Sequence, residues 1–122
     1  MITIIDVSPN VLGYAINGRI EQADIERVFA DMDAKVPAAD KVRIYLEVTD
    51  PDGISLQALM RDVQLGVPRM NYLTRIECLV VVTDNDTVRS MVNVQGQIAR
   101  WMEMRVFPMT EKHKAVTWVA GP

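Results

Sequence analysis

The side chains best suited to catalysis, metal binding or phosphorylation lie in LEVTDPDGISLQALM, at positions 46–60. An apolar strand runs into Asp50-Pro51-Asp52-Gly53, and the pattern predicts a helix from Ser55. Carboxylates at Asp50 and Asp52 could bind a metal ion or exchange protons, and a phosphate on Ser55 would gain from the helix N-terminus. Because α/β proteins build sites where strands lead into helices, this junction is a candidate site.

The same residues also have a structural explanation. Asp-Pro-Asp-Gly is a turn sequence, because proline fixes φ, aspartate bonds its own backbone and glycine accepts a positive φ. Ser55 suits the N-cap position of the helix. No histidine or further acid accompanies the aspartates in sequence, so we expect neither a metal site nor catalytic residues. The turn is therefore favoured, and Ser55 stays a candidate regulatory phosphorylation site beside its capping role.

Other reactive residue types are sparse. His113, the single histidine, lies in TEKHKAV and is expected on an exposed helix surface. Cys78 lies in the apolar run RIECLVVV and is expected to be a small core residue. The sequence contains no GxGxxG, P-loop, CxxC, HExxH or GxSxG motif. We therefore predict a protein that is not an enzyme and needs no cofactor.

The length and composition of the chain limit the classes of protein to which it can belong. The 122 residues suffice for one domain spanning residues 1–122, and 49% of them are hydrophobic. A net charge of −3 argues against nucleic acid as a partner. A single cysteine fits a reducing compartment, and no run approaches the ~18 apolar residues of a membrane span. Since MITIIDV also lacks the features of a signal peptide, we expect a cytoplasmic protein.

Apolar periodicity predicts the elements. Strands over 2–7 and 11–18 form a hairpin, and EQADIERVFADMDAKV is an amphipathic helix. KVRIYLEVT alternates as a strand, a helix follows, and RIECLVVVT has the continuous apolar character of a central parallel strand. Thr83 to Asp86 fit a capping box for a third helix, before the strand MEMRVF and the helix EKHKAVTWV. The predicted fold is a single α/β domain with a mixed, mostly parallel sheet, an N-terminal hairpin and four helices.

Several stretches carry a family resemblance: GYAINGRIEQADIERVF, VRIYLEVTDPDGIS, and RDVQLGV followed by TRIECLVVVTD. Over nearly its whole length the chain resembles the SpoIIAA-like group of STAS-fold proteins, small bacterial domains related to anti-sigma-factor antagonists. The resemblance implies a mixed sheet of four or five strands, no established enzyme activity, binding of apolar molecules and membrane association.

The resemblance also bears on Ser55. In the anti-sigma-factor antagonists a serine at the start of this helix is phosphorylated by a partner kinase. The Asp-Ser pair followed by small residues and glycine is missing here, and bulky Leu56 follows the serine. This departure counts against the phosphorylation switch.

Methionine is enriched, with 8 in the chain, six of them from residue 60 onward. Unbranched thioethers fill irregular cores and also line adaptable pockets. We therefore predict a soft apolar pocket between the second and third helices. One wall is Leu59, Met60, Val63 and Val67, the other is Val88, Met91, Val92 and Gln95, and Met70 and Tyr72 cover the entrance.

The sequence supports several functions in a definite order. Binding of an apolar or lipid-like small molecule leads, followed by a protein–protein switch with Ser55 as phosphosite. Peripheral membrane contact through the second helix is weaker, and draws on residues 87–122, which carry five basic and two acidic side chains. A homodimer formed through a helix face is compatible with all three.

Overall fold

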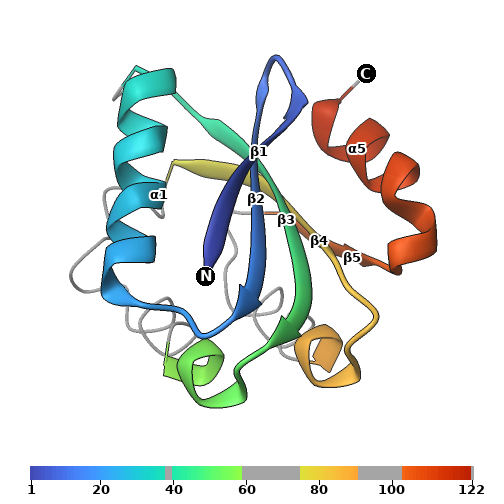
Figure 1. The fold of residues 1–122 in the computed structure, drawn as a ribbon. Coiled ribbons are helices and arrows are strands. Elements are labelled where there is room, and N and C mark those ends of the chain that lie inside the picture. The colour runs from blue at the N-terminus through green and yellow to red at the C-terminus, as the bar shows by residue number, and fades with distance from the viewer. Residues whose placement is uncertain (38–39, 59–74, 91–102, 122) are drawn as a thin grey trace.

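The computed structural model contains one five-stranded sheet with helices on both of its faces (Figure 1). It describes residues 1–37, 40–58, 75–90 and 103–121. The strands are β1 (Ile2–Ser8), β2 (Val11–Gly18), β3 (Val42–Pro51), β4 (Ile76–Val82) and β5 (Glu103–Phe107). Helix α1 (Gln22–Lys35) follows β2, and the 3₁₀ turn η1 (Met109–Glu111) leads into α5 (Lys112–Ala120). Residues 53–58 and 86–90 are also helical.

The strands lie in the order β1-β2-β3-β4-β5. β1 and β2 form the antiparallel hairpin, whereas β2 and β3, β3 and β4, and β4 and β5 pair in parallel. β4 lies between β3 and β5, so the continuous apolar run in it correctly predicted a central parallel strand. The predicted mixed α/β fold is confirmed.

Strand side chains alternate between two faces, which we call the α1 face and the α5 face after the helix that packs on each (Figure 1). In β3, Val42, Ile44 and Val48 belong to the core of the α1 face. Tyr45, from the same strand, is 3% exposed and belongs to the core of the α5 face. The sheet is therefore covered on both sides, as its apolar strands require.

Helix α1 begins and ends where its sequence indicates. Glu21 is the N-cap, and its side chain and that of Asp24 each accept the other residue's backbone N–H in a capping box. Val36 is the C-cap, and Pro37 cannot continue the helix. Met32 is 1% exposed on the packed side of the helix. The Tyr14 hydroxyl, from β2, donates to Asp31 at 2.8 Å and ties the helix to the sheet.

The helix after β4 begins later than expected. Helical residues start at Asp86, and the Asn85 side chain accepts the Val88 N–H at 3.0 Å, which makes Asn85 the N-cap. The predicted capping by Thr83 is wrong. Thr83 is fully buried, and its hydroxyl accepts the Asn85 N–H at 3.1 Å within the preceding turn.

Helix α5 is fastened to the sheet at both ends. At its start, Lys112 pairs with Glu47 at 2.9 Å, and Glu47 also accepts the Tyr45 hydroxyl at 3.2 Å. At its end, the Arg43 guanidinium donates to the Val119 carbonyl at 2.9 Å. Ala115 and Val119 are fully buried between these anchors.

Gly13 gives a first test of this packing. A Cβ at this position would lie 2.5 Å from Val7 Cγ2 and 2.6 Å from the Ile5 carbonyl oxygen. Since the clash includes backbone, we expect Gly13→Ala to lower the free energy of unfolding by about 1–3 kcal/mol. Denaturant titration measures the change.

Gly53→Ala is the matched control. A Cβ added at Gly53 would have no atom within 4 Å, and the φ of this residue is not positive. We expect unchanged or slightly raised stability, by up to about 1 kcal/mol, because alanine restricts the unfolded chain. Equal effects of the two substitutions would show that close packing at Gly13 does not matter.

Candidate functional site

The predicted ligand-binding residues fall mostly outside the described residues. This holds for Leu59, Met60, Val63, Val67, Met70, Tyr72, Met91, Val92 and Gln95. Val88 is described, is 4% exposed and belongs to the core of the α1 face. Leu56, in the helix that follows β3, is buried in the same core. Both helices therefore begin over the α1 face.

Ser55 is not the helix N-cap, so that part of the prediction is wrong. The helix begins at Gly53, and the Asp52 carboxylate accepts the Ser55 N–H at 3.0 Å. Asp52 is the cap, and Ser55 is the third helical residue. The hydrogen bond from the Ser55 amide is also the main reason that the pKa of Asp52 is lowered.

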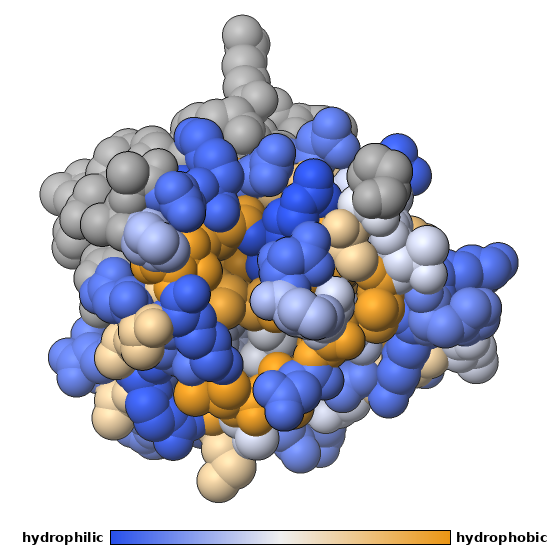
Figure 2. Space-filling view, turned by 90° about the horizontal axis from the view of Figure 1, so that it is seen from above, coloured by the Kyte–Doolittle hydropathy of each residue, from blue (hydrophilic) through white to orange (hydrophobic). Residues whose placement is uncertain are grey.

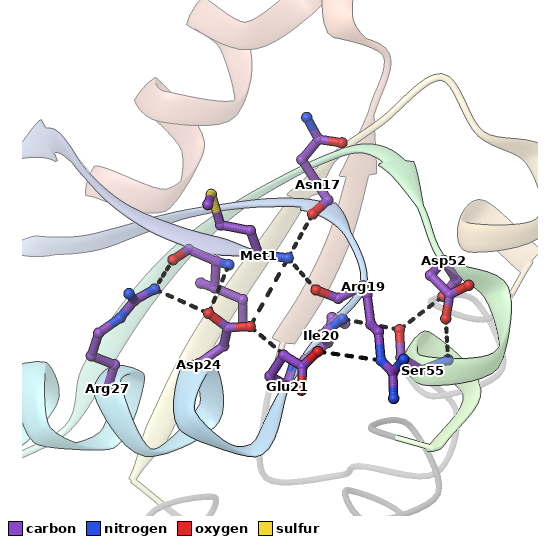
Figure 3. A network of polar contacts seen from close by, with 10 residues as sticks. Met1, Asn17, Arg19, Ile20, Glu21, Asp24, Arg27, Asp52 and Ser55 are labelled. Atoms are coloured by element: carbon purple, nitrogen blue, oxygen red, sulfur yellow. Dashed lines mark hydrogen bonds and ion pairs between the residues drawn. The ribbon is translucent and has the colours of Figure 1, made fainter.

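The Ser55 hydroxyl instead joins two loops (Figure 3). It accepts the Ile20 N–H at 3.0 Å and donates to the Asp52 carbonyl at 3.2 Å. The Asp52 N–H donates to the Gly18 carbonyl at 3.0 Å. The start of the helix after β3 is thus bound to the segment between β2 and α1.

The turn before this helix differs in detail from the expected one. Gly53 has no positive φ, whereas Asp50 has φ +46°. The register between β2 and β3 passes from Asn17–Thr49 to Gly18–Pro51, which leaves Asp50 as an extra residue on β3. A bulge residue of this kind can adopt the left-handed region, and aspartate tolerates it better than most side chains. Strand β3 therefore bends at Asp50 and continues to Pro51.

Asp24 is the centre of the neighbouring polar network (Figure 3). Its carboxylate accepts the Glu21 N–H at 2.9 Å and the Ile2 N–H at 3.3 Å. Arg27 lies 3.2 Å away, and the Met1 amine lies at 4.0 Å. These contacts, led by the Glu21 amide, lower the pKa of Asp24, although its desolvation opposes the shift.

The remaining reactive residues stand apart from this network. His113 is exposed on α5, as expected. Cys78 is 6% exposed in the core of the α5 face, where burial raises the pKa of its thiol. Among the described residues, no group of three or more His, Cys, Asp or Glu side chains is placed to bind a metal ion.

A group of apolar side chains on the strands was not predicted as a site. Leu46, Leu79, Met104 and Val106 lie on the α1 face of β3 to β5, and each is only partly buried. Leu79 is paired with Met104, and both Leu46 and Val106 are paired with Val81. We call these four residues the β3–β5 patch. The enrichment in methionine, which includes Met104, was the feature of the sequence that could have indicated this patch. Strand alternation alone predicts that such residues belong to the core.

The pKa of Asp24 predicts a pH dependence of stability. Because the folded-state pKa is depressed, the carboxylate contributes stability above its ordinary pKa of about 3.9, and this is lost as the pH falls through the folded-state value. Asp24→Asn keeps an acceptor oxygen but removes the negative charge from the first turn of α1 and from the pair with Arg27, so it should cost about 1 kcal/mol near neutral pH. The difference from the wild type should shrink in acid.

Urea unfolding across the acid range measures this convergence. Glu26→Gln, on the exposed surface of the same helix, is the control and should follow the wild type throughout. A constant gap between Asp24→Asn and wild type at every pH would contradict a charge-dependent contribution.

Comparisons with known proteins agree with the architecture. No helix within the described ranges has the length and apolar character to cross a membrane. No curated protein matches the sequence significantly. The crystal structure of an uncharacterized protein with a SpoIIAA-like fold from Shewanella loihica PV-4 is similar, with a TM-score of 0.71 and 20% identity over 97% of this chain and 93% of that chain. At that identity the likeness shows the fold alone. A family model described as SpoIIAA-like matches residues 11–120, and the chain therefore belongs to the SpoIIAA-like family of STAS-like domains.

Proposed function

We propose that this STAS-like domain is a non-enzymatic, cytoplasmic protein that binds an apolar or lipid-like small molecule on the α1 face of its sheet. The observation that carries the proposal is the β3–β5 patch, whose four apolar side chains keep accessible surface in the middle of three strands. Sheet residues on a fully packed face would be buried, as Val81 is at 2% exposure. Apolar surface that stays accessible beside such buried residues favours the binding of an apolar ligand.

The energy available at such a surface is sufficient. Burying each methylene of a ligand yields about 0.8 kcal/mol, so a short alkyl chain reaches useful affinity without a strong polar contact. Met104 adds an adaptable thioether, which suits ligands of varied shape. A binder of this kind needs no sequence motif, which agrees with the lack of any catalytic motif in the sequence.

The helices after β3 and β4 complete the proposed site. Leu56 and Val88, in their first turns, are buried in the core of the same α1 face. The predicted walls and entrance, from Leu59 to Tyr72 and from Val88 to Gln95, follow in those parts of the chain. In this proposal the strands supply the floor, and the predicted residues that follow Leu56 and Val88 in the chain supply the sides.

Paired substitutions of methionine test the site. Glutamine has nearly the shape of methionine but carries an amide, which costs about 1 kcal/mol or more to bury. Met104→Gln should therefore weaken binding of a neutral hydrophobic dye or a long-chain fatty acid by roughly fivefold. Fluorescence titration and native mass spectrometry measure the loss.

Met109→Gln is the control, since Met109 is also partly buried but packs on the α5 face. It should bind like the wild type. Equal losses in both variants would place the ligand elsewhere, and wild-type protein that binds neither fatty acid nor dye would refute the proposal.

A second candidate is the protein–protein switch with Ser55 as phosphosite. The observation favouring it is the Ser55 hydroxyl, which is half-buried and holds the Ile20 N–H across two segments. A phosphate there would replace this hydrogen bond and meet the Asp52 carboxylate, so it would free the loop before α1. Repulsion between the phosphate and the Asp52 carboxylate would also offset part of the stabilisation that the helix N-terminus gives to a phosphate.

Intact-mass analysis of the protein isolated from its native host decides this alternative. A phosphorylated form that disappears in Ser55→Ala, but persists in Ser55→Thr, would support the switch. Unmodified protein under all growth conditions would remove it.

Membrane contact and a homodimer remain weaker proposals. Flotation with neutral and with anionic liposomes tests the first, because the basic residues near the C-terminus should favour the anionic lipid. Sedimentation equilibrium tests the second.

A further inference from the structure

Strand β1 forms one edge of the sheet within the described part of the chain, because the strand order begins with it (Figure 1). Its residues, ITIIDVS, are mostly β-branched, with a single charged side chain and no proline. An edge strand of this kind presents unpaired backbone N–H and C=O groups, to which a strand of another molecule can add. Since a second copy of this chain offers the same strand, pairing between two β1 strands is the hazard that this edge carries.

The ladder with β2 shows which backbone groups of β1 face outward. Met1 and Asn17 exchange two hydrogen bonds, at 2.7 and 2.9 Å. In an antiparallel pair, hydrogen-bonded and non-hydrogen-bonded positions alternate, so Ile2, which lies opposite Ile16, is at a non-hydrogen-bonded position. Ile4, two residues further along, is at the next one. The N–H and C=O groups of Ile2 and Ile4 therefore point away from β2, toward the open edge.

Side chains of α1 bind both outward groups of Ile2 (Figure 3). The Asp24 carboxylate accepts the Ile2 N–H at 3.3 Å, and the Arg27 guanidinium donates to the Ile2 carbonyl oxygen. The two side chains also bond each other at 3.2 Å. Together they offer Ile2 one acceptor and one donor, as the backbone of a neighbouring strand would. The capping box with Glu21 accounts for the position of Asp24 but not for the bond from Arg27 to Ile2.

The other end of β1 is irregular. The register of the hairpin shifts between the pairs Ile5–Gly13 and Ser8–Val11, which places a bulge in β1, and Asp6 within the bulge is exposed. Figure 2 views the molecule from the hairpin end and shows apolar surface interrupted by hydrophilic side chains. Bulges and charged side chains are two devices by which natural edge strands avoid pairing. Regular pairing by β1 is therefore confined to the stretch before the bulge.

That stretch is self-complementary. When two β1 strands lie antiparallel about a two-fold axis at Thr3, Ile2 of each copy lies opposite Ile4 of the other copy. Each of these pairs exchanges two hydrogen bonds through the outward groups of Ile2 and Ile4. Ile4 is available, since its side chain is 40% exposed and no described residue bonds its N–H or C=O. Ile2 is not available, and every hydrogen bond of this pairing requires it.

We propose that Asp24 and Arg27 keep this chain from pairing edge to edge with a second copy of itself, because they take the place of the strand that would otherwise bond Ile2. We call these two residues the blocking pair. The blocking pair acts at a surface separate from the β3–β5 patch and does not depend on the function proposed for that patch.

Amide hydrogen exchange of the wild-type protein gives the first test. The Ile4 N–H should exchange freely at every protein concentration, because it faces solvent and has no partner among the described residues. Protection of this amide that grows with protein concentration would show that the edge pairs in spite of the blocking pair, and would overturn the proposal.

Asp24→Ala with Arg27→Ala removes the blocking pair. In sedimentation equilibrium this variant should self-associate at least about tenfold more tightly than the wild type, and its Ile4 amide should become protected as the protein concentration rises. Glu111→Ala with Lys114→Ala is the matched control, since it also removes an acid and a base three residues apart, here an ion pair of 3.0 Å at the start of α5. The control should associate like the wild type. Equal association in the two double variants, or association without protection of Ile4, would overturn the proposal.

Two further variants separate edge pairing from a loss of stability. Ile4→Lys, added to the variant without the blocking pair, should restore the wild-type association, because a lysine on an edge strand opposes pairing. Association that persists in this triple variant would contradict the proposal. If the double variant fails to fold, Arg27→Ala alone decides, since it leaves the capping box intact and frees only the Ile2 carbonyl. It should associate about threefold more tightly than the wild type, with protection of Ile4, and the lack of both effects would overturn the proposal.

Discussion

Burial of both faces of β3 and β4 is the constraint on which the rest of the structure depends. Val80 and Val82 are fully buried toward α5, while Val81 between them is 2% exposed on the α1 face. A strand of this kind is stable only with helices on both sides. The crossover from β2 to β3 therefore places α1 on one face, and α5 returns over the other face after β5 (Figure 1). The surfaces available for function are those that this packing leaves incompletely covered.

Polar side chains form hydrogen bonds with backbone groups of the segments that follow or precede the strands. Asp24, Ser55 and Arg75 each accept from or donate to backbone groups of segments distant in sequence. Buried backbone groups at loop ends need such partners. Residues that look reactive in sequence are thus largely occupied by structural hydrogen bonds. This shifts attention from the polar junction after β3 to the β3–β5 patch and to the edge of β1.

The order of elements could be predicted because each strand or helix carries its own period of apolar residues. The first residue of each helix was harder to predict, because several residues near a strand–helix junction can serve as the N-cap. The N-caps are Asp52 and Asn85, not Ser55 and Thr83. The hydroxyls of Ser55 and Thr83 accept hydrogen bonds from other backbone amides. The bulge at Asp50 was also beyond local patterns, because it depends on the register between β2 and β3. The predicted helical lining of the ligand site, apart from Val88, lies outside the described residues.

The family, the mixed sheet and the two faces of each strand could be predicted, because they follow from local periodicity and from stretches that are continuous along the chain. Which surfaces stay open depends on how distant segments pack in the folded chain. The β3–β5 patch joins residues from three strands, and the outward groups of Ile2 are bonded by Asp24 and Arg27 from α1. Alternation tells which way a side chain points, but whether another segment covers it depends on long-range packing. That is why LEVTDPDGIS, the stretch richest in apparent chemistry, serves mainly to hold the fold.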